Sequence, residues 1–189
     1  MALIADLKRK FFQRKLEKEL ATRRTKPVVR SLHPETAKHL AVLFPADNAD
    51  DRKLVEKLKT ERRKNGLQTR LLGYFSSPVN ENGSYNFPYF TVKDLTWYGA
   101  PQGKEVEIFL SDSSDLLYVL GSPGDQKMDY LARLKNTSLR VGPFTHEDDA
   151  DNPYNVRIIN DGKQRGIKGQ LNQIDRIFKI INVKKVAAV

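Results

Sequence analysis

The sequence predicts an α/β fold, a three-layer sandwich in which helices cover both faces of a mostly parallel sheet. Two short apolar runs, residues 38–44 and 115–121, are bounded by turn residues, which is typical of strands buried on both faces. Segments with helical character separate the strand-like runs, and strands that alternate with helices favour parallel pairing. The chain of 189 residues is long enough for one such domain with its own core.

The N-terminal segment is set apart by its charge. Residues 1–30 hold ten Lys and Arg against three acidic residues and so contribute +7 of the net charge of +10. Residues 3–24 lack Gly and Pro and are rich in Leu, Lys, Arg and Glu, which predicts a helix, and the prolines that follow predict a linker. We therefore divide the chain into a basic helix with its linker, residues 1–34, and an α/β domain, residues 35–189.

The apolar residues of this helix fall in two rows on nearly opposite sides, with Leu3, Leu7 and Phe11 in one row and Phe12, Leu16 and Leu20 in the other. A membrane-surface helix needs one continuous apolar stripe opposite its cations. The two rows therefore argue against a membrane and for two packing surfaces. The expected partners of residues 3–30 are a nucleic acid, another protein or a second copy of the chain, and the alternative is packing with a solvated basic face.

Turn and cap residues divide the α/β domain into elements. Asn48 or Asp50 is suited to cap a helix, and Gly66 to end it. Pro88 lacks an N–H and so favours an edge position for its strand. The expected strands are 38–44, 68–75, 87–92, 115–121, 138–144 and 154–160, and the expected helices are 49–65, 104–110, 125–135 and 170–181.

The strand at 38–44 is expected to pair with those at 68–75 and 115–121, which makes the sheet Rossmann-like. Ligands of such sheets bind outside the carboxyl ends of the strands, at the point where the strand order reverses. The link before the last strand, at 154–160, has about nine residues, whereas parallel crossovers usually need a dozen or more. We therefore predict that the last strand is antiparallel, which places the basic turn after it on the edge opposite the acidic loops.

The candidate ligand site lies where two neighbouring strands end: Asp47 and Asn48 after the first strand, and Gly121, Ser122 and Gly124 after the central one. A glycine turn at a helix start can hold a phosphate, and acidic edges suit hard cations. This turn lacks the Lys-Ser/Thr of a P-loop, however, and helix capping explains the carboxylates. The residues predict at most a nucleotide or phosphosugar site, with no cofactor and no metal.

The second candidate is an anion site in the glycine-rich basic turn at 162–169, where Lys163, Arg165 and Lys168 accompany free backbone amides at a helix start. A phosphate or an RNA backbone would suit it. No catalytic residue is predicted, because the three histidines are scattered and Ser122 has no evident base. The chain has no cysteine, which excludes thiolate nucleophiles and suits a reducing compartment, so we expect a cytoplasmic protein.

Several short motifs point to a family. They are Asp94-Leu95 with Trp97 and Gly99, Asp115-Leu116-Leu117, and Arg140-Val141-Gly142 with Asn155. With them the chain resembles a small bacterial family of unknown function whose members begin with a basic helix, and this resemblance implies an α/β sandwich with no assigned activity. The same order of motifs is similar to the N-terminal Rossmann half of nucleotide-sugar glycosyltransferases. That similarity does not extend to the half that holds the sugar nucleotide.

These observations favour a non-catalytic cytoplasmic binding module whose basic N-terminal helix docks on a polyanion or a protein partner. The alternative is an enzyme or sensor that binds a nucleotide or phosphosugar at the C-terminal edge of the sheet. The first hypothesis depends on the charge of residues 1–30, and the second on the turn after residue 120.

Overall fold

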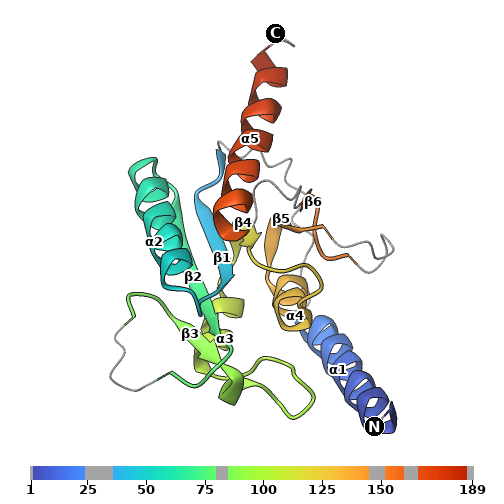
Figure 1. Cartoon of the computed structure of the whole chain (residues 1–189). Helices are drawn as coiled ribbons and strands as arrows, with labels where there is room; N and C mark the ends of the chain where they lie inside the picture. The colour runs from blue at the N-terminus through green and yellow to red at the C-terminus, as the bar shows by residue number, and fades with distance from the viewer. Residues whose placement is uncertain (1, 24–35, 80–84, 145–151, 160–165, 187–189) are drawn as a thin grey trace.

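A computed structural model describes residues 2–23, 36–79, 85–144, 152–159 and 166–186 of the chain. Across these residues, six parallel strands form one sheet in the order β3-β2-β1-β4-β5-β6 (Figure 1). The strands are β1 (His39–Pro45), β2 (Gln68–Phe75), β3 (Tyr89–Thr91), β4 (Ser114–Val119), β5 (Thr137–Pro143) and β6 (Val156–Ile158). The helices are α1 (Ala2–Thr22), α2 (Ala49–Lys64), α3 (Lys104–Ser111), α4 (Gln126–Leu134) and α5 (Gly166–Val186).

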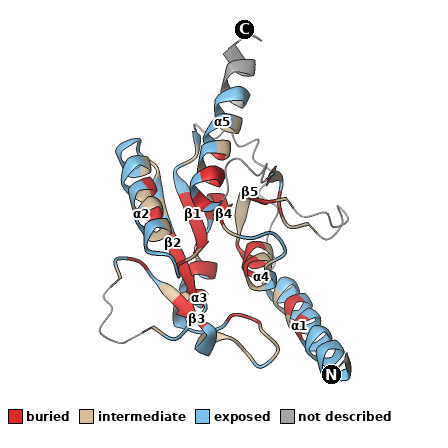
Figure 2. Cartoon of the chain, in the orientation of Figure 1, coloured by how far each residue is buried: buried red, intermediate tan, exposed pale blue. Residues whose placement is uncertain are grey.

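The two central strands are buried on both faces, as their apolar runs predicted. In β1, Leu40, Val42 and Phe44 point to one face of the sheet, while Ala41 and Leu43 point to the other. All five side chains are buried, and the same alternation continues in β4. The sheet therefore separates two apolar cores, and buried residues concentrate along its centre (Figure 2).

The helices complete a three-layer sandwich. Residues of α2 and α5 pack into the core on one face of the sheet, and residues of α3 and α4 pack into the core on the other. Helix α1 lies against α4 and projects beyond the sheet, so it forms a partial further layer (Figure 1). The predicted fold class, an α/β sandwich with a mostly parallel sheet and a preceding helix, is confirmed.

The direction of the last strand was predicted wrongly. Strand β6 pairs with β5 in parallel, at Val141–Val156, Gly142–Arg157 and Pro143–Ile158. The true strand bounds leave twelve residues between Pro143 and Val156, enough for a parallel crossover. Strand β6 therefore ends at the same edge of the sheet as β1 and β4, and the argument that placed the basic turn on the opposite edge no longer holds.

No helix within the described residues combines the length and the apolar character that crossing a bilayer requires.

Candidate functional site

Helix α1 packs on the body of the protein through one of its two apolar rows. Phe12 and Leu16 are buried in the core on the α4 side, and the ring centroids of Phe12 and Tyr130 lie 5.2 Å apart. Leu20, the third member of the row, stays partly exposed. This row holds the helix in place and is not available to a partner.

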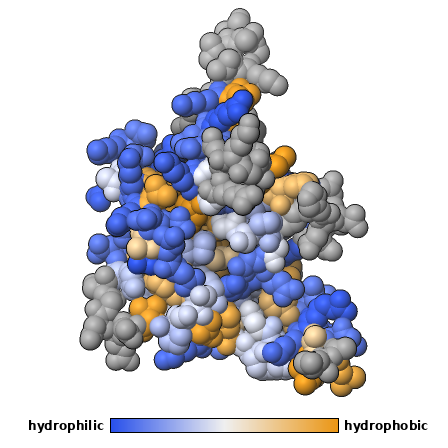
Figure 3. Space-filling model, viewed as in Figure 1, coloured by the Kyte–Doolittle hydropathy of each residue, from blue (hydrophilic) through white to orange (hydrophobic). Residues whose placement is uncertain are grey.

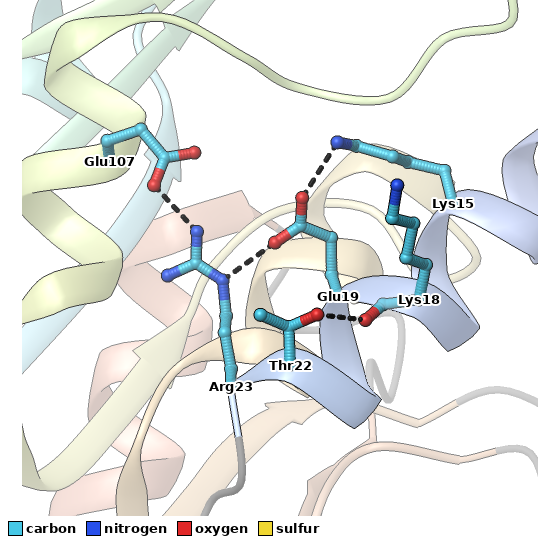
Figure 4. A network of polar contacts seen from close by, with 6 residues as sticks. All are labelled: Lys15, Lys18, Glu19, Thr22, Arg23 and Glu107. Atoms are coloured by element: carbon cyan, nitrogen blue, oxygen red, sulfur yellow. Dashed lines mark hydrogen bonds and ion pairs between the residues drawn. The ribbon is translucent and has the colours of Figure 1, made fainter.

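A chain of polar contacts fixes the end of α1 to α3 (Figure 4). Glu19 accepts from Lys15 at 2.7 Å and from Arg23 at 3.0 Å, and Arg23 reaches across to Glu107 of α3 at 2.6 Å. The hydrogen bond from Lys15 lowers the pKa of Glu19, and burial only partly opposes it. The backbone carbonyl of Lys18, on the same turn, accepts a hydrogen bond from the hydroxyl of Thr22 at 2.8 Å. Figure 4 draws no contact to the ammonium group of Lys18.

The other apolar row of α1 faces solvent. Leu3 is 83% exposed, and Ile4, Leu7 and Phe11 are exposed as well. Beside this row lies Trp97, which is 55% exposed and whose ring centroid is 5.1 Å from that of Phe11. We call these five residues the outer row. They form an exposed apolar patch that begins at the first turn of α1 and ends at the loop after β3.

The charges of α1 are sorted by side. With about 100° of rotation per residue, Asp6, Glu17 and Glu19 project from the half of the helix away from the outer row. The half centred on the outer row carries cations alone, which are Lys8, Lys10, Arg14, Lys15 and Lys18. Within the part of the chain that the structure describes, four of these have no acidic partner: Lys8, Lys10, Arg14 and Lys18. Apolar and hydrophilic surface accordingly meet over α1, at the lower right of Figure 3.

The residues predicted to bind a ligand after β1 make contacts within the protein. The side chain of Asn48 caps α2 and accepts a hydrogen bond from the backbone N–H of Asp50 at 2.7 Å. The carboxylate of Asp47 accepts from the backbone N–H of Ser76 at 2.9 Å and so ties the end of β1 to that of β2. Both residues are exposed, and each has a structural role.

The turn after β4 is joined to α5 by a buried glutamine. Gln170, which is 1% exposed, donates from Nε2 to the carbonyl of Gly121 at 2.7 Å and accepts from the N–H of Gly121 at 2.8 Å. Ser122 and Gly124 follow on the exposed part of the turn. The side chain of Gln170 thus accepts from the backbone N–H of Gly121, which is the donor that a bound anion would need.

The structure describes only part of the predicted anion site. Lys168 is exposed on the first turn of α5, whereas Lys163 and Arg165 lie outside the described residues. Most of the acidic loop after Phe144 is also outside them. Among the side chains that the structure does describe, no group of three His, Cys, Asp or Glu is placed to hold a metal ion. The anion site stays a prediction.

Sequence reasoning missed a buried lysine at the opposite edge of the sheet. Lys135 is 1% exposed, and its ammonium donates to the backbone carbonyls of Phe109 and Asp112 at the end of α3. Burial lowers the pKa of Lys135 to about 8, although nearby Asp112 opposes the shift. A cavity of about 630 Å³ lies beside it, lined also by Arg70, whose guanidinium pairs with Asp112. The only signal in the sequence is that Lys135 follows the last buried turn of α4.

The motif residues of the suspected family have structural roles as well. Asp115 accepts from the N–H groups of Lys38 and His39, at 2.8 and 3.0 Å, and so joins the starts of β4 and β1. Burial would raise the pKa of Asp115, but these hydrogen bonds lower it on balance. Arg140 is largely buried and caps the end of α4 by donating to the carbonyl of Ala132 at 2.7 Å.

Two further motif residues join β5 to the segment before β6. The N–H of Arg140 donates to the side-chain oxygen of Asn155 at 2.9 Å, and the N–H of Asn155 donates back to the carbonyl of Arg140 at 2.9 Å. Gly142 lies under the ring of Tyr154, and an added Cβ would come within 2.3 Å of that ring. The motif residues thus help to assemble the sheet and its helices. Of them, Trp97 and Asn155 are exposed, and Asn155 is hydrogen-bonded to Arg140.

Comparison with known proteins agrees with this conclusion. No curated protein matches the chain. The model of one family matches residues 8–181, which is most of the chain and includes every motif residue named above. The resemblance expected from the sequence is therefore confirmed, and the chain belongs to DUF6913, a family of unknown function.

Proposed function

We propose that this protein is a non-catalytic binding module that docks on a polyanionic or protein partner through α1. One observation carries the proposal: the outward half of α1 combines the outer row with cations that have no acidic partner among the described residues. Large apolar side chains and unpaired charges on one contiguous surface are typical of interaction sites.

The energetics also favour a partner for this surface. Fully burying a Leu, Ile or Phe side chain is worth about 1.5–3 kcal/mol, and the outer row leaves several such side chains in water. The helix does not need them to stay attached, because Phe12, Leu16 and the contacts of Arg23 perform that task. A partner that covers the outer row would recover this free energy.

The titratable groups with shifted pKa values support a non-catalytic role. Lys135 and Arg140 each cap a helix, and Asp115 joins two strands. Active sites instead keep such groups free to act on a substrate, whereas the ammonium of Lys135 is held by two backbone carbonyls although a cavity lies beside it. The alternative of a nucleotide or phosphosugar site after β4 gains no support from the contacts between Gln170 and Gly121.

A site-specific crosslinking experiment in living cells tests the proposal. A photo-crosslinking amino acid at position 7 replaces an outer-row side chain, and the same amino acid at position 13 replaces an exposed glutamine on the other side of α1. We expect adducts from position 7 and few from position 13, with the added mass giving the chemical class of the partner. Equal yields from both positions, or none from either, would contradict the proposal.

A further inference from the structure

We infer that the partner of α1 is the surface of an anionic lipid bilayer, with the outer row inserted among the acyl chains and the adjoining cations at the headgroups. This inference rests on the docking role proposed for α1 and names its partner. It applies to peripheral attachment, in which a helix lies in the plane of the interface.

The structure removes the objection that the sequence raised against a membrane. The apolar residues of α1 fall in two rows, and a membrane-surface helix needs one. Phe12 and Leu16, from the second row, are buried on the α4 side and do not compete for an outside surface. What solvent meets is therefore mainly one apolar stripe, Leu3, Ile4, Leu7 and Phe11, continued by Trp97. From the second row, Leu20 is 36% exposed.

The shape of the surface suits a soft partner more than a folded one. Helix α1 projects from the body of the protein, and Leu3, the most exposed residue of the outer row, lies at its tip (Figure 1). The cavity next to α1, of about 720 Å³, is lined by Phe12, Gln13 and Leu16 from the inner side of the helix. The outer row lies on the exposed side of this projecting helix and therefore forms a convex ridge. A bilayer yields to a convex apolar ridge, whereas a protein partner must supply a matching groove.

The charges select an anionic surface. On the outward half of α1, Lys10 flanks the outer row, and Arg14 and Lys18 continue it. Lys8 lies at the border of this half and also lines the cavity on the inner side. Each Lys or Arg near an anionic membrane contributes about 1 kcal/mol, which corresponds to about fivefold in binding. Trp97, at the border of the row, is the residue type that prefers the headgroup level.

The same features disfavour the other partners. Pairing two copies of α1 along their outer rows would bring cations against cations. Nucleic-acid backbones are held by cations and polar groups, and they leave large aliphatic side chains such as Leu3 and Ile4 unused. A lipid surface is the partner that uses both parts of the patch.

Trp97 makes the test direct, because it is the single tryptophan of the chain and lies in the outer row. The full-length protein is mixed with vesicles of phosphatidylcholine, either pure or containing phosphatidylglycerol, and binding is measured by flotation together with Trp97 emission. We expect flotation and a blue shift only with phosphatidylglycerol, and less binding as salt rises. No flotation with phosphatidylglycerol at low salt would overturn the inference, and so would binding without a shift.

Two variants with the same charge change locate the contact. Leu7→Glu places a carboxylate in the outer row, and Gln13→Glu places one on the opposite side of α1, where the side chain is also exposed. We expect Leu7→Glu to weaken vesicle binding about tenfold or more, because it places a charge where the leucine would insert among the acyl chains. We expect Gln13→Glu to change vesicle binding less than about threefold. Equal losses would mean nonspecific charge attraction and would overturn the inference.

Failure of this inference can be told apart from failure of the proposed function. If the crosslinker at position 7 yields protein or nucleic-acid adducts while vesicles do not bind, α1 docks on a different partner and the lipid inference alone falls. If neither experiment distinguishes position 7 from position 13, both proposals fall.

Discussion

The interior behind β4 and β5 and the outward half of α1 use positive charge in opposite ways. In the interior, Lys135 and Arg140 each meet backbone carbonyls at the end of a helix. On α1, Lys8, Lys10, Arg14 and Lys18 have no acidic partner among the described residues. The two interior cations thus stabilise the fold, whereas these four cations of α1 are available to a partner. The net charge of the chain therefore says less about function than the contacts of each charge.

The contrast depends first on Phe12 and Leu16, through which α1 packs on the body of the protein. Phe12→Ala should lower the free energy of unfolding by about 3 kcal/mol, because it leaves a cavity between α1 and α4. Leu7→Ala, on the outer row of the same helix, should change it by less than about 0.5 kcal/mol. Urea denaturation of both variants checks the difference, and similar losses would show that the two rows are not distinct.

Replacing the buried Lys135 should have the next largest effect on the free energy of unfolding. Lys135→Met keeps the length of the side chain but leaves the carbonyls of Phe109 and Asp112 without their donor, which should cost about 2 kcal/mol. Lys93→Met, at an exposed position, serves as the control and should be nearly neutral. A neutral Lys135→Met would mean that water replaces the ammonium at no cost and that Lys135 is not needed as a cap.

The pH dependence of stability gives an independent measure of the same burial. The pKa of Lys135 is lowered from 10.5 to about 8 in the folded protein, so above pH 8 the unfolded chain binds more protons at this residue. Stability should therefore rise relative to Lys135→Met by about 1.4 kcal/mol per pH unit between about pH 8 and 10. Below pH 8 the two proteins should run parallel, because Lys135 is then protonated in both states.

Denaturation of the wild type and the variant at several pH values checks this slope. The window closes near pH 10, because Lys135 then loses its proton in the unfolded chain as well. Burial raises the pKa of Tyr118 and of Tyr130 in wild type and variant alike, so their effect cancels in the difference. A flat difference between wild type and variant would contradict a lowered pKa for Lys135.

The smallest effect should come from the outward cations. Arg14→Gln with Lys18→Gln should change the free energy of unfolding by less than about 0.5 kcal/mol, because neither side chain has an acidic partner in the described structure. The same double variant should weaken docking on an anionic partner clearly. A large loss of stability would mean that Arg14 and Lys18 stabilise the fold as Lys135 and Arg140 do, and would contradict the contrast between the two groups of cations.

Local patterns were sufficient to predict the sandwich and most of its elements. The apolar runs of β1 and β4 and the cap at Asn48 appear in the structure where they were expected. The direction of β6 was missed because its length and start differ by a few residues from the predicted strand, and twelve residues allow a crossover that nine do not. Element boundaries are the part of such a prediction that sequence patterns define least.

The candidate surface was less predictable than the fold. Periodicity showed two apolar rows on α1, but only the packing surface of α4 decides which of them is buried. Lys135 was missed because lysines are rarely buried, and its place depends on carbonyls of α3 far along the chain. The aromatic residues in and after β3 have different environments. Phe90 is buried in the core, whereas Trp97 is exposed beside Phe11.

The bond pair between Gln170 and Gly121 has a consequence for how the chain folds during its synthesis. Gly121 lies in the turn after the central strand β4, but Gln170 belongs to α5, the last helix among the described residues. Domains fold from the N-terminus as they are made, so the middle of this sheet lacks its closing side chain until α5 has emerged. In a nascent chain that ends before α5, the carboxyl ends of β1 and β4 should therefore lack the contacts of Gln170. Helix α5 completes the domain at the end of synthesis.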